Sequence, residues 1–192
     1  MMSRMGTTRH VDGLELRPLY RWEYEALGVQ GAFDDEKVEL LDGNLVYAAE
    51  EGPPHAALCA RLTRLLIEAI PASEGEVRVG NPFALSDLSE PQPDFLVAAP
   101  QPQNYRTGHP GAASLVIEVS QTSRRRDLGL KASLYAAGGV PDYWVVDVAR
   151  DEVVVHRDPA GLTFASVTGY RDGVIRALHH PGVALDVRRL LR

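Results

Sequence analysis

The chain has 192 residues, of which 45% are hydrophobic and 24% charged, a mixture typical of a folded domain and too apolar for a disordered chain. Its 20 Lys and Arg against 26 Asp and Glu give a net charge of −6, which excludes a protein that coats nucleic acid by bulk positive charge but allows a local basic patch. A single cysteine, Cys59, excludes an intramolecular disulfide and a cysteine-rich zinc cluster, and no apolar run reaches the roughly 18 residues of a membrane span, so we expect a cytoplasmic protein.

The first part of the chain predicts a tail followed by a helix and a hairpin. Residues 1–16 are expected to form a flexible tail in front of a single domain over 17–192. Apolar residues then recur at helical spacing over 18–28, with a proline suited to the first turn and a glycine to the end. An Asp-Gly dipeptide between two short apolar runs predicts a β-hairpin over 37–48.

The remaining elements alternate between helices and short strands. Leucines on one face predict a long helix over 54–70, and further helical patterns cover 125–137 and 185–191. Short apolar runs predict strands over 76–79, 83–85, 94–98, 115–119, 143–148, 153–156, 162–167 and 174–178. The segment 100–113, rich in proline and glycine, is expected to be a loop. This order predicts an α/β domain with a mixed sheet.

Two acidic residues interrupt otherwise apolar strands. Asp94 opens one strand, and Glu118 lies between branched aliphatic residues in the next. A carboxylate in such a strand is expected to be at least partly buried, and burial is costly without a partner. The partner of Glu118 can be a metal, a lysine, or one of the arginines in the run 124–126. We expect the two acidic strands to be neighbours in one sheet, with the 54–70 helix packed on a face of it.

Lys131 is the third candidate of this site. At about 100° per residue, it falls on the same arc of its helix as Leu128, Leu130 and Tyr135, and not on the solvated side. Its ammonium can therefore point to a carboxylate cluster at the sheet. Two alternatives remain open, since the side chain can extend outward to solvent or pair with Asp127 four residues earlier.

Two carboxylates and a lysine suit metal-dependent phosphodiester hydrolysis. Mg²⁺ prefers oxygen ligands and keeps bound waters, and Mn²⁺ can take the same type of site. The ion lowers the pKa of a bound water and neutralises charge on phosphate oxygens, while a lysine can orient the water or stabilise developing charge. The sequence therefore predicts Mg²⁺ or Mn²⁺ as cofactor.

Several short motifs occur together in a fixed order along nearly the whole chain. They are Glu39-Leu40-Leu41-Asp42-Gly43, Pro53-Pro54-His55, Pro93-Asp94, Leu115-Val116-Ile117-Glu118-Val119-Ser120, Arg126-Asp127-Leu128-Gly129-Leu130-Lys131, Tyr135 with Gly139-Val140, and Tyr143-Trp144-Val145-Val146-Asp147. This set resembles the Uma-type restriction-endonuclease family of the PD-(D/E)XK nuclease superfamily, over about residues 17–191. The resemblance implies a restriction-endonuclease-like core, a central mixed β-sheet flanked by helices. It also implies that Asp94 and Glu118 are the two acidic residues of the nuclease motif.

The sequence departs from the superfamily pattern at the third position of the motif. Ser120 stands two residues after Glu118, where a standard nuclease of this type has lysine. The resemblance implies that Lys131, on the next helix, replaces it. Gln121 is the less favoured alternative for the same role.

Further residues can line or extend the site, each with a simpler alternative. Glu39 can give the metal another carboxylate or lie in solvent on its strand. His55 can face the site or cap its helix, and Ser120 can line the site. The run Arg124, Arg125 and Arg126 can contact phosphates or form an ordinary solvated surface.

These observations favour a metal-dependent DNA endonuclease with catalytic residues Asp94, Glu118 and Lys131. The alternative is a catalytically silent nuclease-fold module that binds nucleic acid or a protein partner, which the displaced lysine and the acidic net charge favour. We expect a homodimer, because the later strands offer an edge for association and nucleases acting on duplex DNA commonly present two sites. Trp144, Tyr143 and Cys59 are interpreted as core residues.

Overall fold

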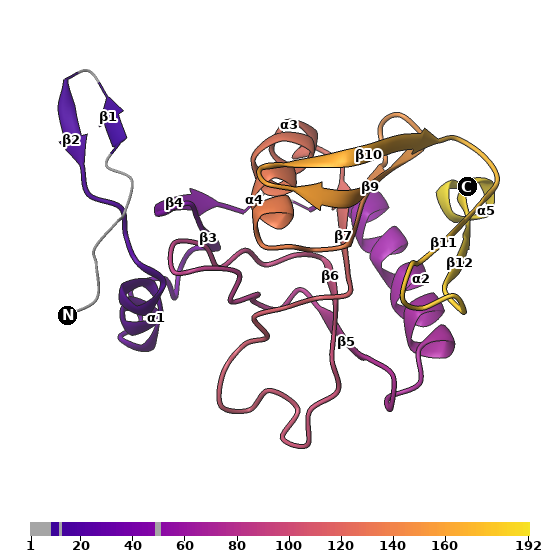
Figure 1. Ribbon diagram of the computed structural model, residues 1–192, viewed down its shortest axis with the longest axis horizontal. Helices are drawn as coiled ribbons and strands as arrows, with labels where there is room; N and C mark the ends of the chain where they lie inside the picture. Colours follow the sequence, from indigo (N-terminus) through magenta and orange to yellow (C-terminus); the bar gives the residue numbers. More distant parts are fainter. Residues whose placement is uncertain (1–8, 12, 49–50) are drawn as a thin grey trace.

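A computed structural model describes residues 9–11, 13–48 and 51–192, and its central feature is a six-stranded sheet (Figure 1). The strands lie in the order β10-β9-β8-β7-β6-β5, and only β7 and β8 pair in parallel. Their bounds are β5 (Glu76–Val79), β6 (Phe95–Ala98), β7 (Leu115–Ser120), β8 (Asp142–Asp147), β9 (Glu152–Ala160) and β10 (Thr163–Tyr170). The expected mixed sheet flanked by helices is confirmed.

The middle strands carry apolar side chains on both faces, as expected for strands covered by helices on both sides. In β7, Leu115, Ile117 and Val119 pack on one face, whereas Val116 and Glu118 point to the other. All residues of β6, β7 and β8 are buried. The strand β6, which begins one residue after Asp94, pairs antiparallel with β7, which bears Glu118. The two strands are therefore neighbours, as predicted.

One face of the sheet is covered by α2 (Pro53–Ala69) and by the C-terminal elements (Figure 1). Leu58, Leu62 and Leu66 form the buried stripe of α2 and contact the odd-numbered side chains of β7. The C-terminal elements are β11 (Val174–Arg176), β12 (Ala184–Asp186) and α5 (Val187–Leu191). The predicted packing of the long helix is confirmed.

The opposite face is covered by the segment between β7 and β8. The sequence predicts one helix over 125–137, but the segment consists of α3 (Arg124–Arg126), a π-helical turn η1 (Asp127–Lys131) and α4 (Ala132–Ala137). The expectation that Leu130 faces inward was wrong, since its side chain is 39% exposed. The physical reason is the π-helical turn, which takes in an extra residue and changes the angle per residue that the prediction assumed.

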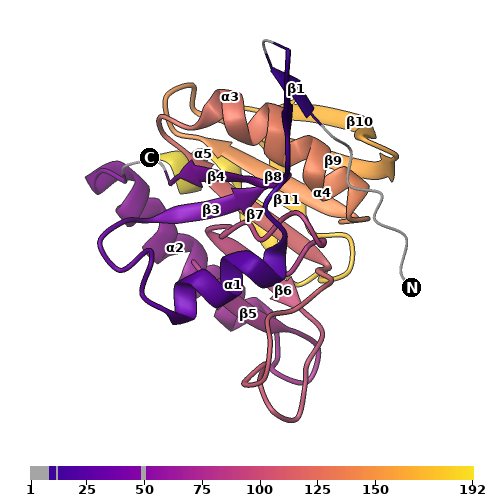
Figure 2. The same ribbon diagram turned by 90° about the vertical axis from the view of Figure 1, so that its left-hand side faces the viewer.

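A third layer holds the N-terminal helix and hairpin beside the main sheet (Figure 2). It contains α1 (Arg21–Val29), β3 (Val38–Leu41) and β4 (Asn44–Tyr47). The hairpin turn has positive φ at both Asp42 (50°) and Gly43 (76°), as a type I′ turn requires. A Cβ on Gly43 would lie 2.4 Å from the Cβ of Pro18, so the close approach of this chain also requires glycine.

Three further predicted elements differ from the structure. Residues 83–85 form no strand, because none of their amides donates to a partner strand. The amides of Phe83 and Ala84 donate to the carbonyls of Pro91 and Pro110, and the amide of Leu85 donates to the carbonyl of Phe83. The expected C-terminal helix is divided into β12 and α5, since Asp186 accepts a hydrogen bond from the Arg189 amide and caps the helix there. Within the expected tail, β1 (Arg9–Val11) pairs with β2 (Leu14–Leu16), while residues 1–8 lie outside the described part.

Among the helices of the described residues, none is both long and apolar enough to cross a membrane.

Candidate active site

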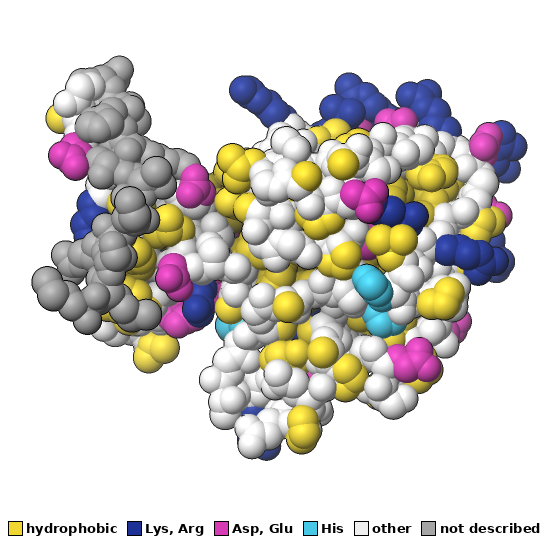
Figure 3. All heavy atoms as spheres, in the orientation of Figure 1, with side chains coloured by type: hydrophobic (Ala, Val, Ile, Leu, Met, Phe, Trp, Pro, Cys, Tyr) yellow, Lys and Arg dark blue, Asp and Glu magenta, His cyan; other side chains and the backbone are white. Residues whose placement is uncertain are grey.

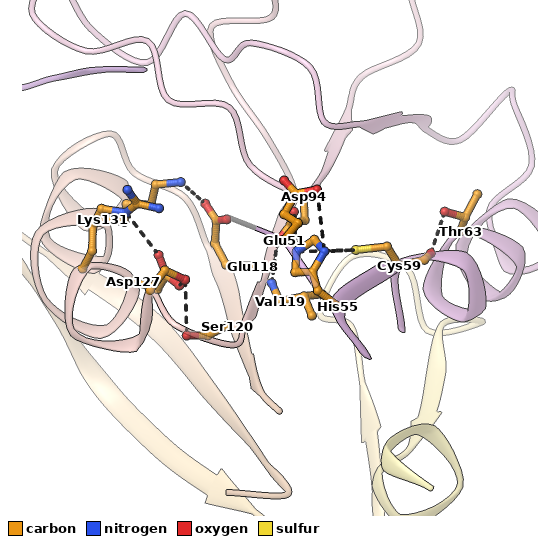
Figure 4. A network of polar contacts seen from close by, with 12 residues as sticks. Glu51, His55, Cys59, Thr63, Asp94, Glu118, Val119, Ser120, Asp127 and Lys131 are labelled. Carbon is orange, nitrogen blue, oxygen red and sulfur yellow. Dashed lines mark hydrogen bonds and ion pairs between the residues drawn. The ribbon is translucent and has the colours of Figure 1, made fainter. Parts of the chain in front are cut away.

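The three residues predicted to form the site converge on one cavity of about 50 Å³ (Figure 4). Asp94 comes from the residue before β6, Glu118 from β7 and Lys131 from the last position of the π-helical turn. The described residues that line this cavity are Glu39, Ala48, Glu51, His55, Gln92, Asp94, Glu118, Val119, Gln121, Thr122, Ser123, Arg126 and Lys131. Segments from four distant parts of the chain therefore form a single polar pocket.

Asp94 is fixed by two contacts on opposite oxygens. Its Oδ2 accepts a hydrogen bond of 2.6 Å from the backbone amide of Val119, next to Glu118 on the neighbouring strand. Its Oδ1 lies 3.1 Å from Nε2 of His55 on α2. These contacts fix the orientation of the carboxylate just before the start of β6.

Glu118 and Glu39 share the ammonium group of Lys131. The Nζ atom of Lys131 lies 2.9 Å from Oε1 of each glutamate, and all three side chains are buried. The Oε1 atom of Glu118 also accepts a hydrogen bond of 2.7 Å from the Tyr135 hydroxyl. Lys131 therefore neither extends to solvent nor pairs with Asp127, the two alternatives left open by the sequence.

Burial raises the pKa of Glu118 to about 8; Lys131 opposes the rise and nearby Asp94 contributes to it. For Lys131, burial by itself lowers the pKa, but the surrounding carboxylates raise it more, so the ammonium is held charged. The hydrogen bond to Asp94 is the main cause that raises the pKa of His55 to about 10. Near neutral pH the pocket therefore combines cationic Lys131 and His55 with a Glu118 that keeps its proton up to about pH 8.

The structure decides between the alternatives for the secondary candidates. Glu39 is 2% exposed and not in solvent, and its Oε1 also accepts from the Gln92 amide at 2.8 Å. His55 makes no cap to its helix and faces the pocket. Gln121 lines the pocket, whereas Ser120 is buried behind it, with its Oγ 3.4 Å from Oγ of Ser123.

The three arginines of the run have different surroundings. Arg124 forms an ion pair of 2.6 Å with Asp147 on β8, and Arg125 is exposed. Arg126 alone of the three lines the pocket, where it donates a hydrogen bond of 2.8 Å to the Tyr47 carbonyl. None of them pairs with Glu118 among the ion pairs of the described residues, so this alternative partner was wrong.

Sequence reasoning missed two residues next to the site. Tyr135 was predicted to lie on the inner arc of its helix, but its hydrogen bond to Glu118 was not predicted. Its spacing of four residues from Lys131, which puts both side chains on one face of the helix, was the available signal. Cys59 was interpreted only as a core residue. It is partly buried against the core, yet its Sγ also lies 3.6 Å from Nδ1 of His55, one helical turn earlier.

The pocket fits a hard divalent cation by its donor atoms. Asp94, Glu118 and Glu39 contribute carboxylates, and Gln121 contributes an amide oxygen. Oε2 of Glu39 and Oε1 of Gln121 are buried and accept no hydrogen bond from the described residues. Unpartnered buried oxygens are costly, and coordination of Mg²⁺ or Mn²⁺ would satisfy them.

The mixed sheet with helices on both faces, with one acidic residue just before β6 and another on the adjacent strand β7, defines a restriction-endonuclease-like fold. A family model described as "Putative restriction endonuclease" matches residues 21–188, and the chain belongs to this family, Uma2. A similar solved structure is described as "a putative nuclease belonging to DUF820 from Anabaena variabilis ATCC 29413". It has a TM-score of 0.70 at 15% identity, over 91% of this chain and 98% of that one, a likeness that establishes the fold. No curated protein matches the chain.

Proposed function

We propose that this protein is a metal-dependent endonuclease that hydrolyses phosphodiester bonds in DNA. The observation that carries the proposal is the convergence of Asp94, Glu118 and Lys131 on one pocket. The unpartnered oxygens of Glu39 and Gln121 in the same pocket support a bound cation. Membership of the Uma2 family agrees with this chemistry.

In the proposed site, Asp94 and Glu118 hold Mg²⁺ or Mn²⁺, and Glu39 is a further carboxylate within the pocket. Bound there, the ion would supply a water of lowered pKa and would neutralise charge on the scissile phosphate. The hydrogen bond from the Val119 amide and the contact with His55 keep Asp94 in place. Tyr135 keeps Glu118 in place by its hydrogen bond to Oε1.

Lys131 is proposed to position the attacking water or to stabilise charge on the phosphate. An ammonium group has three N–H donors. Two of them donate to Glu118 and Glu39, which leaves one for a water or a phosphate oxygen in the pocket. Gln121, whose side-chain oxygen is unpartnered, is the alternative residue for this role.

Binding of DNA is proposed to rely on local basic residues. Arg126 at the pocket and the exposed Arg125 next to it can meet phosphates close to the site. Figure 3 shows Lys and Arg side chains gathered along one margin of the molecule, over the region where Figure 1 places β9, β10 and α5. The net charge of −6 therefore hides an uneven distribution of charge.

A plasmid-nicking assay tests the proposal. Wild-type protein, D94N and E118Q, purified identically, are incubated with supercoiled DNA in Mg²⁺, Mn²⁺ or EDTA. We expect nicking by the wild type that needs a divalent cation and is lost in both variants, which are nearly isosteric. Nicking that survives D94N would identify a contaminant. Absence of Asp94-dependent nicking with either ion would overturn the proposal and favour a silent module that binds nucleic acid or a protein.

We also propose that the protein is a homodimer. The strand β10 is at the edge of the sheet and leaves one row of its backbone groups without a strand partner among the described residues. Such an edge can pair with a second copy. Light scattering should then give twice the chain mass of 21.0 kDa, and a result at the chain mass would contradict the proposal.

A further inference from the structure

A second group of metal-ligating side chains lies on the other side of Asp94, away from Glu118 (Figure 4). His55 and Cys59 are four residues apart on α2, so both point from the same face of the helix. With Asp94 they offer one ligand atom each, all within 4.8 Å of one another. We propose that His55, Cys59 and Asp94 form a binding site for Zn²⁺.

The distances between the ligand atoms suit tetrahedral zinc. With Zn–N and Zn–O near 2.0 Å and Zn–S near 2.3 Å, tetrahedral coordination separates N from O by about 3.3 Å and N from S by about 3.5 Å. Nε2 of His55 lies 3.1 Å from Oδ1 of Asp94 and 3.8 Å from Sγ of Cys59. The separation of N and O is close to the tetrahedral value. Sγ lies slightly nearer to Nδ1, at 3.6 Å, so the Cys59 side chain has to turn toward Nε2 when the ion binds.

The donor types select zinc over the ion of the nuclease pocket. A thiolate with an imidazole prefers Zn²⁺, whereas Mg²⁺ takes oxygen ligands. The i, i+4 spacing of His55 and Cys59 is also the spacing by which zinc helices present two ligands on one face. The zinc site therefore differs in chemistry from the oxygen site that Asp94 forms with Glu118.

The surroundings of His55 fit the second shell of a zinc ligand. A metal-bound histidine usually directs its other ring nitrogen to a carboxylate, which fixes the orientation of the ring. Here Nε2 faces Asp94, and Nδ1 lies 3.8 Å from Oε2 of Glu51. Binding releases the protons of the imidazolium and of the thiol to solvent. Three protein ligands leave the fourth position of tetrahedral zinc for a water molecule. Water can reach this position because Glu51, His55 and Asp94 line the open pocket.

Cobalt(II) provides the test, because it substitutes for zinc and shows a thiolate-to-metal charge-transfer absorption in the near ultraviolet. Cys59 is the only cysteine, so any such band reports this residue. We expect folded, metal-free protein at pH 8 to develop the band at one Co²⁺ per chain, and Zn²⁺ to abolish it. In H55Q the affinity for Co²⁺ should fall by about 100-fold or more, since loss of an outer-shell partner of a zinc ligand already lowers metal affinity by roughly 10–100-fold.

The variant E118Q keeps the three zinc ligands and removes a ligand of the oxygen site. It should retain the Co²⁺ band while losing Mg²⁺-dependent nicking, so failure of the zinc site and failure of the nuclease proposal are distinguishable. Alkylation of Cys59 gives a second measurement that needs no variant: Zn²⁺ should slow it and Mg²⁺ should not. Co²⁺ binding without the band, equal affinity in H55Q, or no protection by Zn²⁺ would each overturn the proposal.

Discussion

Replacing Lys131 by methionine removes the ammonium group that two buried carboxylates share, while keeping a long unbranched side chain. Glu118 and Glu39 are 4% and 2% exposed, and each accepts a hydrogen bond of 2.9 Å from the ammonium. In K131M the two carboxylates remain buried without their common partner. We expect a large decrease in stability, because burial leaves both carboxylates poorly hydrated and no other cation among the described residues replaces the ammonium.

The magnitude follows from the two hydrogen bonds that the ammonium group donates. Removing one partner of a buried ion pair costs about 3–5 kcal/mol, and two charge-assisted hydrogen bonds of roughly 1.5–3 kcal/mol each agree with that range. For a chain of this size, each kcal/mol shifts the melting temperature by about 2–4 °C, so K131M should melt about 6–20 °C lower. The decrease should be smaller at pH 5, where Glu118, whose pKa burial raises to about 8, is protonated.

Urea unfolding followed by circular dichroism at pH 9, above the pKa of about 8 of Glu118, measures this effect, with a matched control in the same chain. The sequence has one other lysine, Lys37, which is exposed, so K37M should change the free energy of unfolding by no more than roughly 0.5 kcal/mol. Adding E118Q to K131M should recover part of the stability by removing a charge. The reasoning would be refuted if K131M were as stable as K37M, or if E118Q destabilised K131M further.

Three further predictions concern the metal ligands, Glu90 and Tyr135. Millimolar Mn²⁺ should raise the melting temperature of the wild type but not of D94N or E118Q, because only the native state brings both ligands together; equal shifts in all three proteins would contradict the site. Burial is the main cause that raises the pKa of Glu90 from 4.5 to about 7. Between these two pH values the folded protein keeps a proton that the unfolded chain has lost, so stability falls as the pH rises from about 4.5 to about 7. E90Q should therefore be more stable than the wild type at pH 8, by roughly 3 kcal/mol at most, and equal to it at pH 4, as chemical denaturation at the two pH values can establish. Y135F should cost about 1–3 kcal/mol by removing the hydroxyl that donates to Glu118 at 2.7 Å, and unchanged urea unfolding would show that this bond contributes nothing.

The sequence by itself determined the elements whose signals are local. The Asp-Gly turn, the leucine stripe of α2 and the apolar runs of β6, β7 and β8 depend on neighbouring residues, and the structure confirms all of them. The strand predicted over 83–85 was wrong, because the prediction used only this local signal. Phe83 is fully buried and apolar, but whether a run pairs as a strand depends on partners elsewhere in the chain.

The candidate site was only partly accessible from the sequence. Asp94 and Glu118 were found because a carboxylate in an apolar strand is unusual, and the acidic motif adds to that signal. The direction of the Lys131 side chain was left open, and its hydrogen bond with Glu39, 92 positions away, was not predicted.

Only the tertiary structure decided how these groups meet. The pairing of β6 with β7 sets Asp94 against the Val119 amide, and the packing of the third layer brings Glu39 over the sheet to Lys131. The uniform helical period already placed Lys131 on the inner side, but only the π-helical turn explains why Leu130 points outward. Helical and strand periods are local properties of the chain, whereas the position of a buried charge is set by partners distant in sequence, because only they can replace the water it loses on folding.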